Sequence, residues 1–316
     1  MVDAPVGVVG AVDCGTNSTR LLVTDDRGRA LARLMRITRL GQGVDATGVL
    51  DPGAVERTIR VLAEYRSTLD ELGAGRVRMV ATSAVRDAAN GQAFLDEASE
   101  VVGVQAELLS GLEEGRLAFQ GATAELPPRR GDDVVVDIGG GSTELMASRD
   151  GALEVVSVDL GCVRLTERYL RHDPPKADEL SAAIGAVDVE LDRAGEAVPL
   201  LTSRGQDRRL IGLAGTVSTL SALDQGLAEY DRDRLHHSHL SIHAVAGWTE
   251  RLGEERAEDR ARHTGMVRGR EDVIVGGALV LRQVMVRFGF DDCTVSESDI
   301  LDGMAAELRG RPPSRP

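Results

Sequence analysis

An internal repeat constrains the fold of this 316-residue chain more than any other feature. Residues 12–21 read VDCGTNSTRL and residues 136–145 read VDIGGGSTEL, with aspartate, glycine, serine, threonine and leucine recurring at a spacing of 124 positions. Each copy follows an apolar run and leads into another, which is typical of a β-hairpin with a turn rich in glycine and hydroxyl groups. Two such copies predict two similar domains that face each other.

The rest of the chain alternates between short apolar runs with strand character and longer segments with helix character. This alternation favours an α/β fold with partly parallel sheets. Asp51 and Pro52 begin a long helix, as cap and first-turn proline. After a strand at 209–213, another helix is expected from about Val217, and a final helix from Ser298. The segment 127–131, with two prolines and two arginines, is the clearest linker signal.

Composition narrows the class of protein. Hydrophobic residues make up 42% and charged residues 28% of the chain, a normal globular balance. No apolar run reaches the roughly 18 residues that a membrane-spanning helix needs, and the first residues lack the pattern of a secretory signal. The three cysteines lie far apart, which argues against a disulfide framework or a cysteine zinc site. We therefore expect a cytoplasmic protein without a membrane partner.

The formal net charge is −14. A field of this sign disfavours nucleic-acid binding, which depends on neutralising phosphates, so no nucleic-acid partner is expected. An anionic substrate stays possible if backbone amides and arginines form a local pocket for it. Such a basic path could include Arg86, Arg116, Arg164 and Arg168. The last two lie four residues apart on one face of an expected helix, although they could equally be solvated or paired with Glu167 and its neighbours.

The two hairpin turns are the first candidate binding sites. Their backbone N–H groups and hydroxyls could converge on phosphate oxygens without any lysine, because glycine lets the main chain approach a ligand closely. The candidate phosphate-binding residues there are Gly15, Thr16, Asn17, Ser18, Gly139, Gly140, Gly141, Ser142 and Thr143. Asp13 and Asp137 end the strands before these turns and could hold Mg²⁺ directly or through water, with Glu144 as a further partner.

A second candidate is the segment LSGLEEGR, residues 109–116, in which a helix is expected to begin with two glutamates. Acidic residues in a first turn often serve only the helix dipole and the cap. A glutamate there could instead orient and deprotonate a water molecule. The residues alone do not choose between Glu113 and Glu114.

Three further clusters could bind ligands. Arg86 lies one turn into a helix after Thr82 and Ser83 and could bind phosphate oxygens as a fork. Gly215 and Thr216 belong to a glycine- and hydroxyl-rich turn before a helix, another possible anion site. Four histidines also cluster, at positions 236, 237, 239 and 243. His239 and His243 have metal-ligand spacing if both lie on one helix, but no third ligand is evident, and surface or substrate-edge histidines are favoured.

Six segments occur in the order and spacing of one family: DCGTNSTRLL, ATSAVRDAAN, LLSGLEEGR, VVDIGGGSTEL, LGCVRLTE and IGLAGTVSTL. Over about residues 8–308 the chain resembles the exopolyphosphatase/guanosine pentaphosphate phosphohydrolase family of the actin, Hsp70 and sugar-kinase superfamily. The resemblance implies that Glu114 is the catalytic base and Arg86 a phosphate-binding arginine. It also implies that Asp137 and Glu144 bind Mg²⁺ (or Mn²⁺) and water, and that residues 15–18 and 139–143 form two phosphate loops.

The same resemblance implies an α/β fold of two actin-like (ribonuclease H-like) lobes with an active-site cleft between them. The expected lobes are residues 1–124 and 125–298, with a C-terminal helix in 299–316 that packs back on the first lobe. Longer family members carry a further helical domain with an HD motif, for which this chain has no room. The dipeptide His172-Asp173 is isolated and is not that motif. The missing domain puts a firm grip on long chains in doubt.

The implied reaction is Mg²⁺-dependent hydrolysis of the terminal phosphoanhydride of inorganic polyphosphate, with release of orthophosphate. One alternative is the removal of the 5′-terminal phosphate from guanosine pentaphosphate. Another is a weakly active or non-catalytic sensor of such nucleotides. An actin-like kinase is a third alternative, although the glutamate of SGLEEGR belongs with hydrolysis and no acceptor-sugar signature is visible. We also expect a homodimer.

Overall fold

The computed structural model describes residues 7–127, 131–203 and 207–310. The chain forms two compact units. Unit 1 comprises Met1–Glu125 and Asp299–Arg315, and unit 2 comprises Leu126–Ser298. Part of the expected linker, residues 128–130, lies outside the described residues.

Unit 1 is built on a mixed sheet of five strands in the order β3-β2-β1-β4-β5. β1 and β2 form the first hairpin of the repeat, and both β1–β2 and β2–β3 pair antiparallel. β4 and β5 continue the sheet in parallel to β1. The strands are β1 (Val9–Cys14), β2 (Ser18–Thr24), β3 (Ala30–Ile37), β4 (Arg76–Ala81) and β5 (Ala106–Leu108).

Unit 2 repeats this arrangement. Its six-stranded sheet has the order β10-β11-β9-β6-β7-β8, so β8-β7-β6-β9-β11 matches the five strands of unit 1 in order and in direction. β10 is an added antiparallel edge strand. The strands are β6 (Asp132–Ile138), β7 (Thr143–Arg149), β8 (Ala152–Val158), β9 (Arg208–Leu213), β10 (His239–Ser241) and β11 (Asp292–Val295). The two similar α/β domains expected from the repeat are thereby confirmed, and their fold is the one that the resemblance implied.

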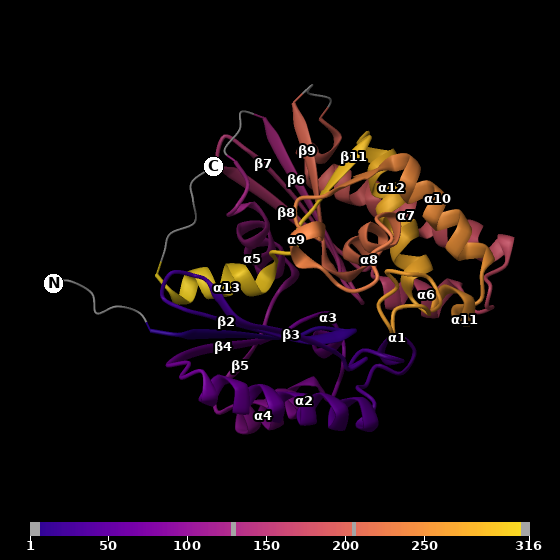
Figure 1. Ribbon diagram of the computed structural model, residues 1–316. Coiled ribbons are helices and arrows are strands. Elements are labelled where there is room, and N and C mark those ends of the chain that lie inside the picture. Colours follow the sequence, from indigo (N-terminus) through magenta and orange to yellow (C-terminus); the bar gives the residue numbers. More distant parts are fainter. Residues whose placement is uncertain (1–6, 128–130, 204–206, 311–316) are drawn as a thin grey trace. The chain divides into compact units, whose positions relative to one another are not determined.

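Helices cover both faces of the sheet in unit 1 (Figure 1). Val12 and Cys14 of β1 face the core under α2 and α4, whereas Val9 and Ala11 face the core under α5 and α13. β1 is therefore buried on both sides. The helices of unit 1 are α1 (Val44–Thr47), α2 (Pro52–Glu71), α3 (Ser83–Arg86), α4 (Gly91–Val102), α5 (Gly111–Thr123) and α13 (Ile300–Leu308).

In unit 2 one large core joins the sheet to the helices beside it. Val134, Val136 and Leu145 of the second hairpin pack in it with Val187 of α7 and Ala278 of α12. The helical elements of unit 2 are α6 (Cys162–Tyr169), α7 (Ala177–Ala197), the 3₁₀ helix η1 (Pro199–Thr202), α8 (Ala214–Asp224), α9 (Arg232–Leu235), α10 (Ile242–Glu254), α11 (Ala257–Arg260) and α12 (Ile274–Phe288). Among the described residues no helix is long and apolar enough to cross a membrane.

Two expected helix starts are corrected. α8 begins at Ala214 rather than near Val217, because the chain turns in a single step at Ala214, whose φ is 67°, and Gly215 already lies in the first turn. The last helix begins at Ile300 rather than at Ser298, because the Asp299 side chain caps it by accepting a hydrogen bond from Leu301 N. The expected start of α2 is confirmed, since Asp51 accepts a hydrogen bond from Ala54 N.

Candidate active site

The turns of the two hairpins have the same backbone geometry. Gly15 N donates to Ser18 O at 3.1 Å, and Gly139 N donates to Ser142 O at 3.0 Å. In unit 1 the carbonyl of Asn17 accepts from Thr38 N and Arg39 N, while the buried side-chain Nδ2 of Asn17 has no hydrogen-bond partner among the described residues. A buried donor of this kind suits an oxygen-rich ligand, because an unmet donor costs about 1–3 kcal/mol.

The second turn rests on the start of α6. Cys162 N donates to Gly139 O, and Val163 N and Arg164 N donate to Gly140 O. The side chain of Arg164 adds a bond from Nε to Gly141 O at 2.7 Å. The carbonyl oxygens of the turn thus accept hydrogen bonds from α6, which hold the turn in place. An anion site is built from N–H donors, so these bonds do not compete with it.

Gly161 makes this anchoring possible. A Cβ atom at position 161 would lie only 2.2 Å from the carbonyl oxygen of Gly140. This oxygen belongs to the backbone and cannot move aside as the end of a flexible side chain could. Only glycine at position 161 therefore lets α6 approach the turn this closely. The sequence contained this glycine in the segment LGCVRLTE, but nothing in it indicated which backbone Gly161 would touch.

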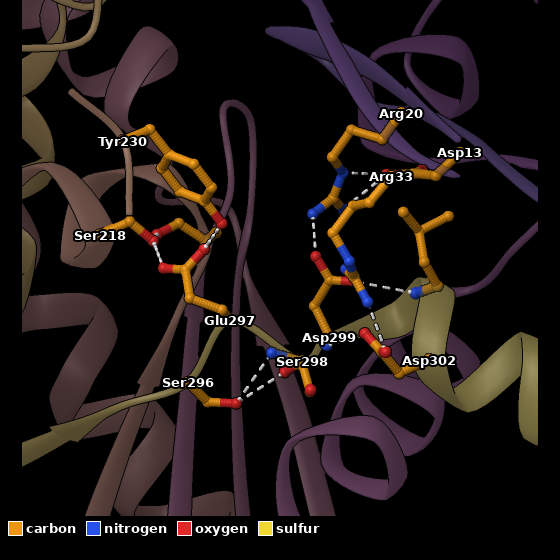
Figure 2. A network of polar contacts seen from close by, with 12 residues as sticks. Asp13, Arg20, Arg33, Ser218, Tyr230, Ser296, Glu297, Ser298, Asp299 and Asp302 are labelled. Atoms are coloured by element: carbon orange, nitrogen blue, oxygen red, sulfur yellow. Dashed lines mark hydrogen bonds and ion pairs between the residues drawn. The ribbon is translucent and has the colours of Figure 1, made fainter. Parts of the chain in front are cut away.

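The two aspartates that end β1 and β6 have different surroundings. Asp13 is buried, and its Oδ2 accepts hydrogen bonds from Arg20 Nε at 2.9 Å and from Nη2 at 2.6 Å. Arg20 also binds Asp299 at the start of α13 (Figure 2). Burial raises the pKa of Asp13, and the guanidinium of Arg20 opposes that rise. Asp13 Oδ1 has no hydrogen-bond partner in the described part of the chain, which leaves one oxygen for a ligand.

In unit 2 a glutamate takes the place of that arginine. Glu144 pairs with Asp137 across β6 and β7, in the register position where Arg20 pairs with Asp13 in unit 1. Directly paired residues project from the same face of a sheet. Asp137 and Glu144 are both buried, and Ser157 Oγ donates to Glu144 Oε1 at 2.7 Å. Two buried carboxylates side by side fit Mg²⁺, which proteins bind through one or two carboxylates together with substrate phosphates and water.

The structure distinguishes the two glutamates at the start of α5. Glu113 closes a capping box, since its Oε2 accepts from Ser110 N at 3.1 Å and from Ser110 Oγ at 2.8 Å. These hydrogen bonds, led by the one from the backbone, lower the pKa of Glu113. Glu114 takes no part in the cap, and its side chain is only 14% exposed. The capping role that both glutamates could have filled thus belongs to Glu113.

Arg86 lies beside Glu114. It ends the short helix α3, and its Nη1 donates to Leu109 O at 2.8 Å, in the residue pair that precedes α5. The same Nη1 is 3.9 Å from Glu114 Oε2. The hydrogen bond to Leu109 O holds the Arg86 guanidinium at the start of α5. Arg86 and the Glu114 carboxylate therefore lie close together in unit 1.

A residue that sequence reasoning missed lies at the start of α8. Arg270 is buried, 8% exposed, and its Cζ is 1.8 Å from the point where a Cβ on Gly215 would stand. The guanidinium therefore lies directly over the first turn of α8, next to the candidate residues Gly215 and Thr216. No motif indicated Arg270, because 55 positions separate it from Gly215. A cation on this turn adds to the attraction that its backbone amides have for an anion.

The two histidines with metal-ligand spacing lie on different elements. His239 lies in β10 and His243 in α10, so the two do not share a helix. His239 Nδ1 contacts Asp292 Oδ2 at 2.6 Å, and His236 stacks on His237. Across residues 7–127, 131–203 and 207–310 no group of three or more His, Cys, Asp or Glu side chains is arranged to hold a metal ion by itself.

Comparison with known proteins gives consistent relatives. The model of the Ppx/GppA phosphatase family matches residues 22–310. Exopolyphosphatase 2 of Mycobacterium tuberculosis is 44% identical over 96% of this chain and 98% of its own. The guanosine-5′-triphosphate,3′-diphosphate pyrophosphatase of Vibrio atlanticus is 29% identical over 94% of this chain and 58% of its own.

Solved structures agree. The crystal structure of an exopolyphosphatase-like protein superposes with a TM-score of 0.89 at 34% identity, covering 96% of this chain and 99% of that one. The family model spans residues 22–310, which include the second hairpin and the α5 and α8 segments, and the mycobacterial relative covers 96% of the chain. This chain therefore belongs to the Ppx/GppA phosphatase family.

Proposed function

We propose that this protein is an exopolyphosphatase, which hydrolyses the terminal phosphoanhydride of inorganic polyphosphate and releases orthophosphate. The observation that carries the proposal is the environment of Glu114, a largely buried carboxylate beside Arg86 at the start of α5. Glu113 forms the capping box of this helix, and Glu114 takes no part in it. The name of the mycobacterial relative, exopolyphosphatase 2, supports the same activity.

In this proposal the chain binds the end of the substrate through main-chain and side-chain donors. The turns 15–18 and 139–143 donate N–H groups to phosphate oxygens, and Asn17 Nδ2 adds a buried donor. The amides of Gly215 and Thr216, with Arg270 over them, form a further anion subsite. Arg86 binds the terminal phosphoryl group, while Glu114 orients a water molecule and accepts its proton. Donors fixed before the substrate arrives stabilise charge that develops in the transition state.

The proposed cofactor is Mg²⁺, or Mn²⁺ in its place. In unit 2, Asp137 and Glu144 would hold the ion. In unit 1 the candidate ligand is Asp13, whose Oδ1 has no hydrogen-bond partner among the described residues. When bound, the ion would neutralise negative charge on the phosphate oxygens and help to position them. The Ser157 hydroxyl keeps the Glu144 carboxylate oriented by donating to Oε1.

The proposal gives a role in the reaction to Glu114 and to Asp137. Residues that act as a unit in catalysis have strongly non-additive effects. If Glu114 and Asp137 serve the same step, the double variant Glu114→Gln/Asp137→Asn loses little more activity than the worse single variant. Fully additive losses would assign the two residues to independent steps.

Phosphate release from short polyphosphate, long polyphosphate and guanosine pentaphosphate, measured in parallel with Mg²⁺ and with EDTA, tests this function. We expect metal-dependent release from polyphosphate. Preferred hydrolysis of guanosine pentaphosphate would support the alternative activity, removal of the 5′-terminal phosphate from this nucleotide. The name of the Vibrio relative is consistent with that alternative. Tight binding of such nucleotides without any release would instead indicate a sensor.

We further propose that the protein is a cytoplasmic homodimer. Light scattering coupled to size-exclusion chromatography tests the assembly, since a chain of 316 residues gives well-separated masses for one and two copies. A single species at the monomer mass over a wide range of concentration would overturn the dimer.

A further inference from the structure

A groove of about 350 Å³ in unit 2 lies between α6 and α7. Three arginines line it: Arg164 and Arg168 from α6 and Arg193 from α7. The basic path expected from the sequence included Arg164 and Arg168, and Arg193 joins these two although it lies 25 positions beyond Arg168. The groove is thus assembled by helix packing rather than by one segment.

The groove starts at the second phosphate loop. Arg164, which lines the groove, donates from Nε to Gly141 O at 2.7 Å and from its backbone N to Gly140 O at 3.1 Å. Arg168 follows one helical turn further along α6, so it lies farther from the loop along the same face. A chain that leaves the loop along α6 therefore meets cationic groups one after another.

The local charge is opposite in sign to that of the protein. The acidic residues that line the groove are Asp159 and Glu190, one fewer than the arginines. Glu190 forms an ion pair with Arg193, whose side chain is nevertheless 68% exposed. In a protein with a net charge of −14, a groove with an excess of arginine attracts anions where most of the surface repels them.

We propose that this groove binds the phosphates that follow the terminal one in a linear inorganic polyphosphate chain. The proposal rests on the function proposed above and extends it to the length of chain that the enzyme grips. Internal phosphates of such a chain each carry a negative charge and two free oxygens, which suit the planar fork of arginine. A substrate that ends within the loop cannot reach Arg168 or Arg193.

The test is the double variant Arg168→Gln/Arg193→Gln. Arg164 is left intact because it holds the phosphate loop. For long-chain polyphosphate we expect KM to rise about tenfold or more, the effect of losing one or two charge-assisted contacts, and its dependence on salt to weaken. For tripolyphosphate, KM and kcat should stay close to those of the wild type.

Arg262→Gln provides the matched control. Arg262 is 72% exposed and pairs with Asp259 three positions before it, as Arg193 pairs with Glu190, but it does not line the groove. This variant should leave both substrates unaffected. Equal changes in KM for both chain lengths in the double variant, or no change in either, would contradict the proposal that the groove binds the polyphosphate chain. A larger change for guanosine pentaphosphate than for long polyphosphate would assign the arginines to a nucleotide instead.

Direct binding separates this proposal from the proposed hydrolysis. Titration of fluorescently labelled long polyphosphate into wild type and double variant, without turnover, measures the grip of the groove alone. We expect weaker binding by the double variant even if neither protein releases phosphate. Binding of equal strength by both proteins would overturn the groove, whereas failure to release phosphate with a normal difference in binding would overturn only the hydrolysis.

Discussion

Glu113 and Glu114 are adjacent in the chain but differ in exposure and in the groups that they contact. Glu113 is exposed and accepts two hydrogen bonds from Ser110. Glu114 is mostly buried and lies by Arg86. Their side chains point to different surroundings because successive residues of a helix are about 100° apart. Glu113 is therefore a suitable control position for variants of Glu114 that test catalysis.

The variant Glu114→Gln should lower kcat by about 10²- to 10⁴-fold, the usual effect of losing a general base, while KM for polyphosphate changes little. Glu113→Gln should keep kcat near that of the wild type and change the melting temperature little, because glutamine at this position still closes a capping box. Steady-state kinetics and thermal unfolding of both variants check this. A Glu114→Gln enzyme with more than about a tenth of the wild-type kcat contradicts the role as base.

Asp137→Asn should raise the Mg²⁺ concentration needed for half-maximal activity, because a neutral amide is a poorer ligand for a hard cation. Titration of activity and of Mn²⁺ binding, the latter by electron paramagnetic resonance, measures the shift. Asp133→Asn is the control, since Asp133 lies on the same strand and is paired with Arg209. Superimposable titrations for Asp137→Asn and wild type would remove Asp137 from the metal site.

At the scale of elements, the approach of α6 to the second hairpin fixes the phosphate loop. Gly161→Ala places a methyl group 2.2 Å from Gly140 O, so the loop or the helix must move. Overpacking of this kind costs about 1–3 kcal/mol, and activity should fall with stability. Gly185→Ala is the control, because a Cβ at this position in α7 meets nothing within 4 Å. It should stabilise the helix by about 0.5–1 kcal/mol. Equal unfolding free energies for both variants would disprove this account.

The start of α7 is held by a glutamate whose ionisation matters. Glu179 accepts hydrogen bonds from the His172 ring and from Lys176 N and His172 N, and the His172 ring is the main cause that lowers its pKa to about 2. A depressed carboxyl pKa stabilises the fold above the ordinary value of 4.5 and ceases to do so as the pH falls toward 2.

Glu179→Gln should therefore lower the melting temperature near neutral pH. The gap to wild type should narrow as the pH falls from about 4.5 toward 2. Glu196→Gln, an exposed position on the same helix, should melt with the wild type throughout. Thermal unfolding followed by circular dichroism at several pH values measures both curves. A gap that stays constant down to the lowest pH would contradict the role of the ionised carboxylate.

Much of this could be read from the sequence because it depends on neighbours in the chain. The hairpins were predictable since Asp13 and Asp137 begin the same turn twice, and α2 was predictable since Asp51 caps it locally. Contacts between distant segments could not be read. Arg270 over Gly215 and Arg193 opposite Arg168 depend on how helices pack. The sequence predicted chemistry within turns better than chemistry between elements.

At the scale of the whole molecule, unit 1 is assembled from both ends of the chain. Ile300, Leu301, Met304 and Ala305 of α13 pack with Val9, Ala11 and Leu22 of the first hairpin and with Leu117 of α5. Arg20 of β2 binds Asp299, the N-cap of α13, and Arg33 of β3 binds Asp302 within this helix (Figure 2). The helix thus supplies both apolar cover and charge partners.

Met304→Ala should lower the unfolding free energy by about 2–5 kcal/mol, because Met304 is fully buried in this core. Val286→Ala, at a position 60% exposed on α12, should change it by less than about 0.5 kcal/mol. Denaturant unfolding of both variants measures the difference. Comparable losses in the two would show that α13 contributes little to the core of unit 1.

The contribution of α13 has a consequence for how the polypeptide is made. A ribosome delivers the first hairpin early, but α13, which helps to cover one of its faces, follows only after all of residues 126–298 have emerged. Unit 2 is continuous and can complete itself during synthesis, whereas the apolar face formed by Val9, Ala11 and Leu22 has only α5 to cover it until α13 emerges. Translation that stops before residue 299 thus yields a chain in which unit 2 can fold but unit 1 exposes apolar surface. Chaperones and proteases recognise products of this kind.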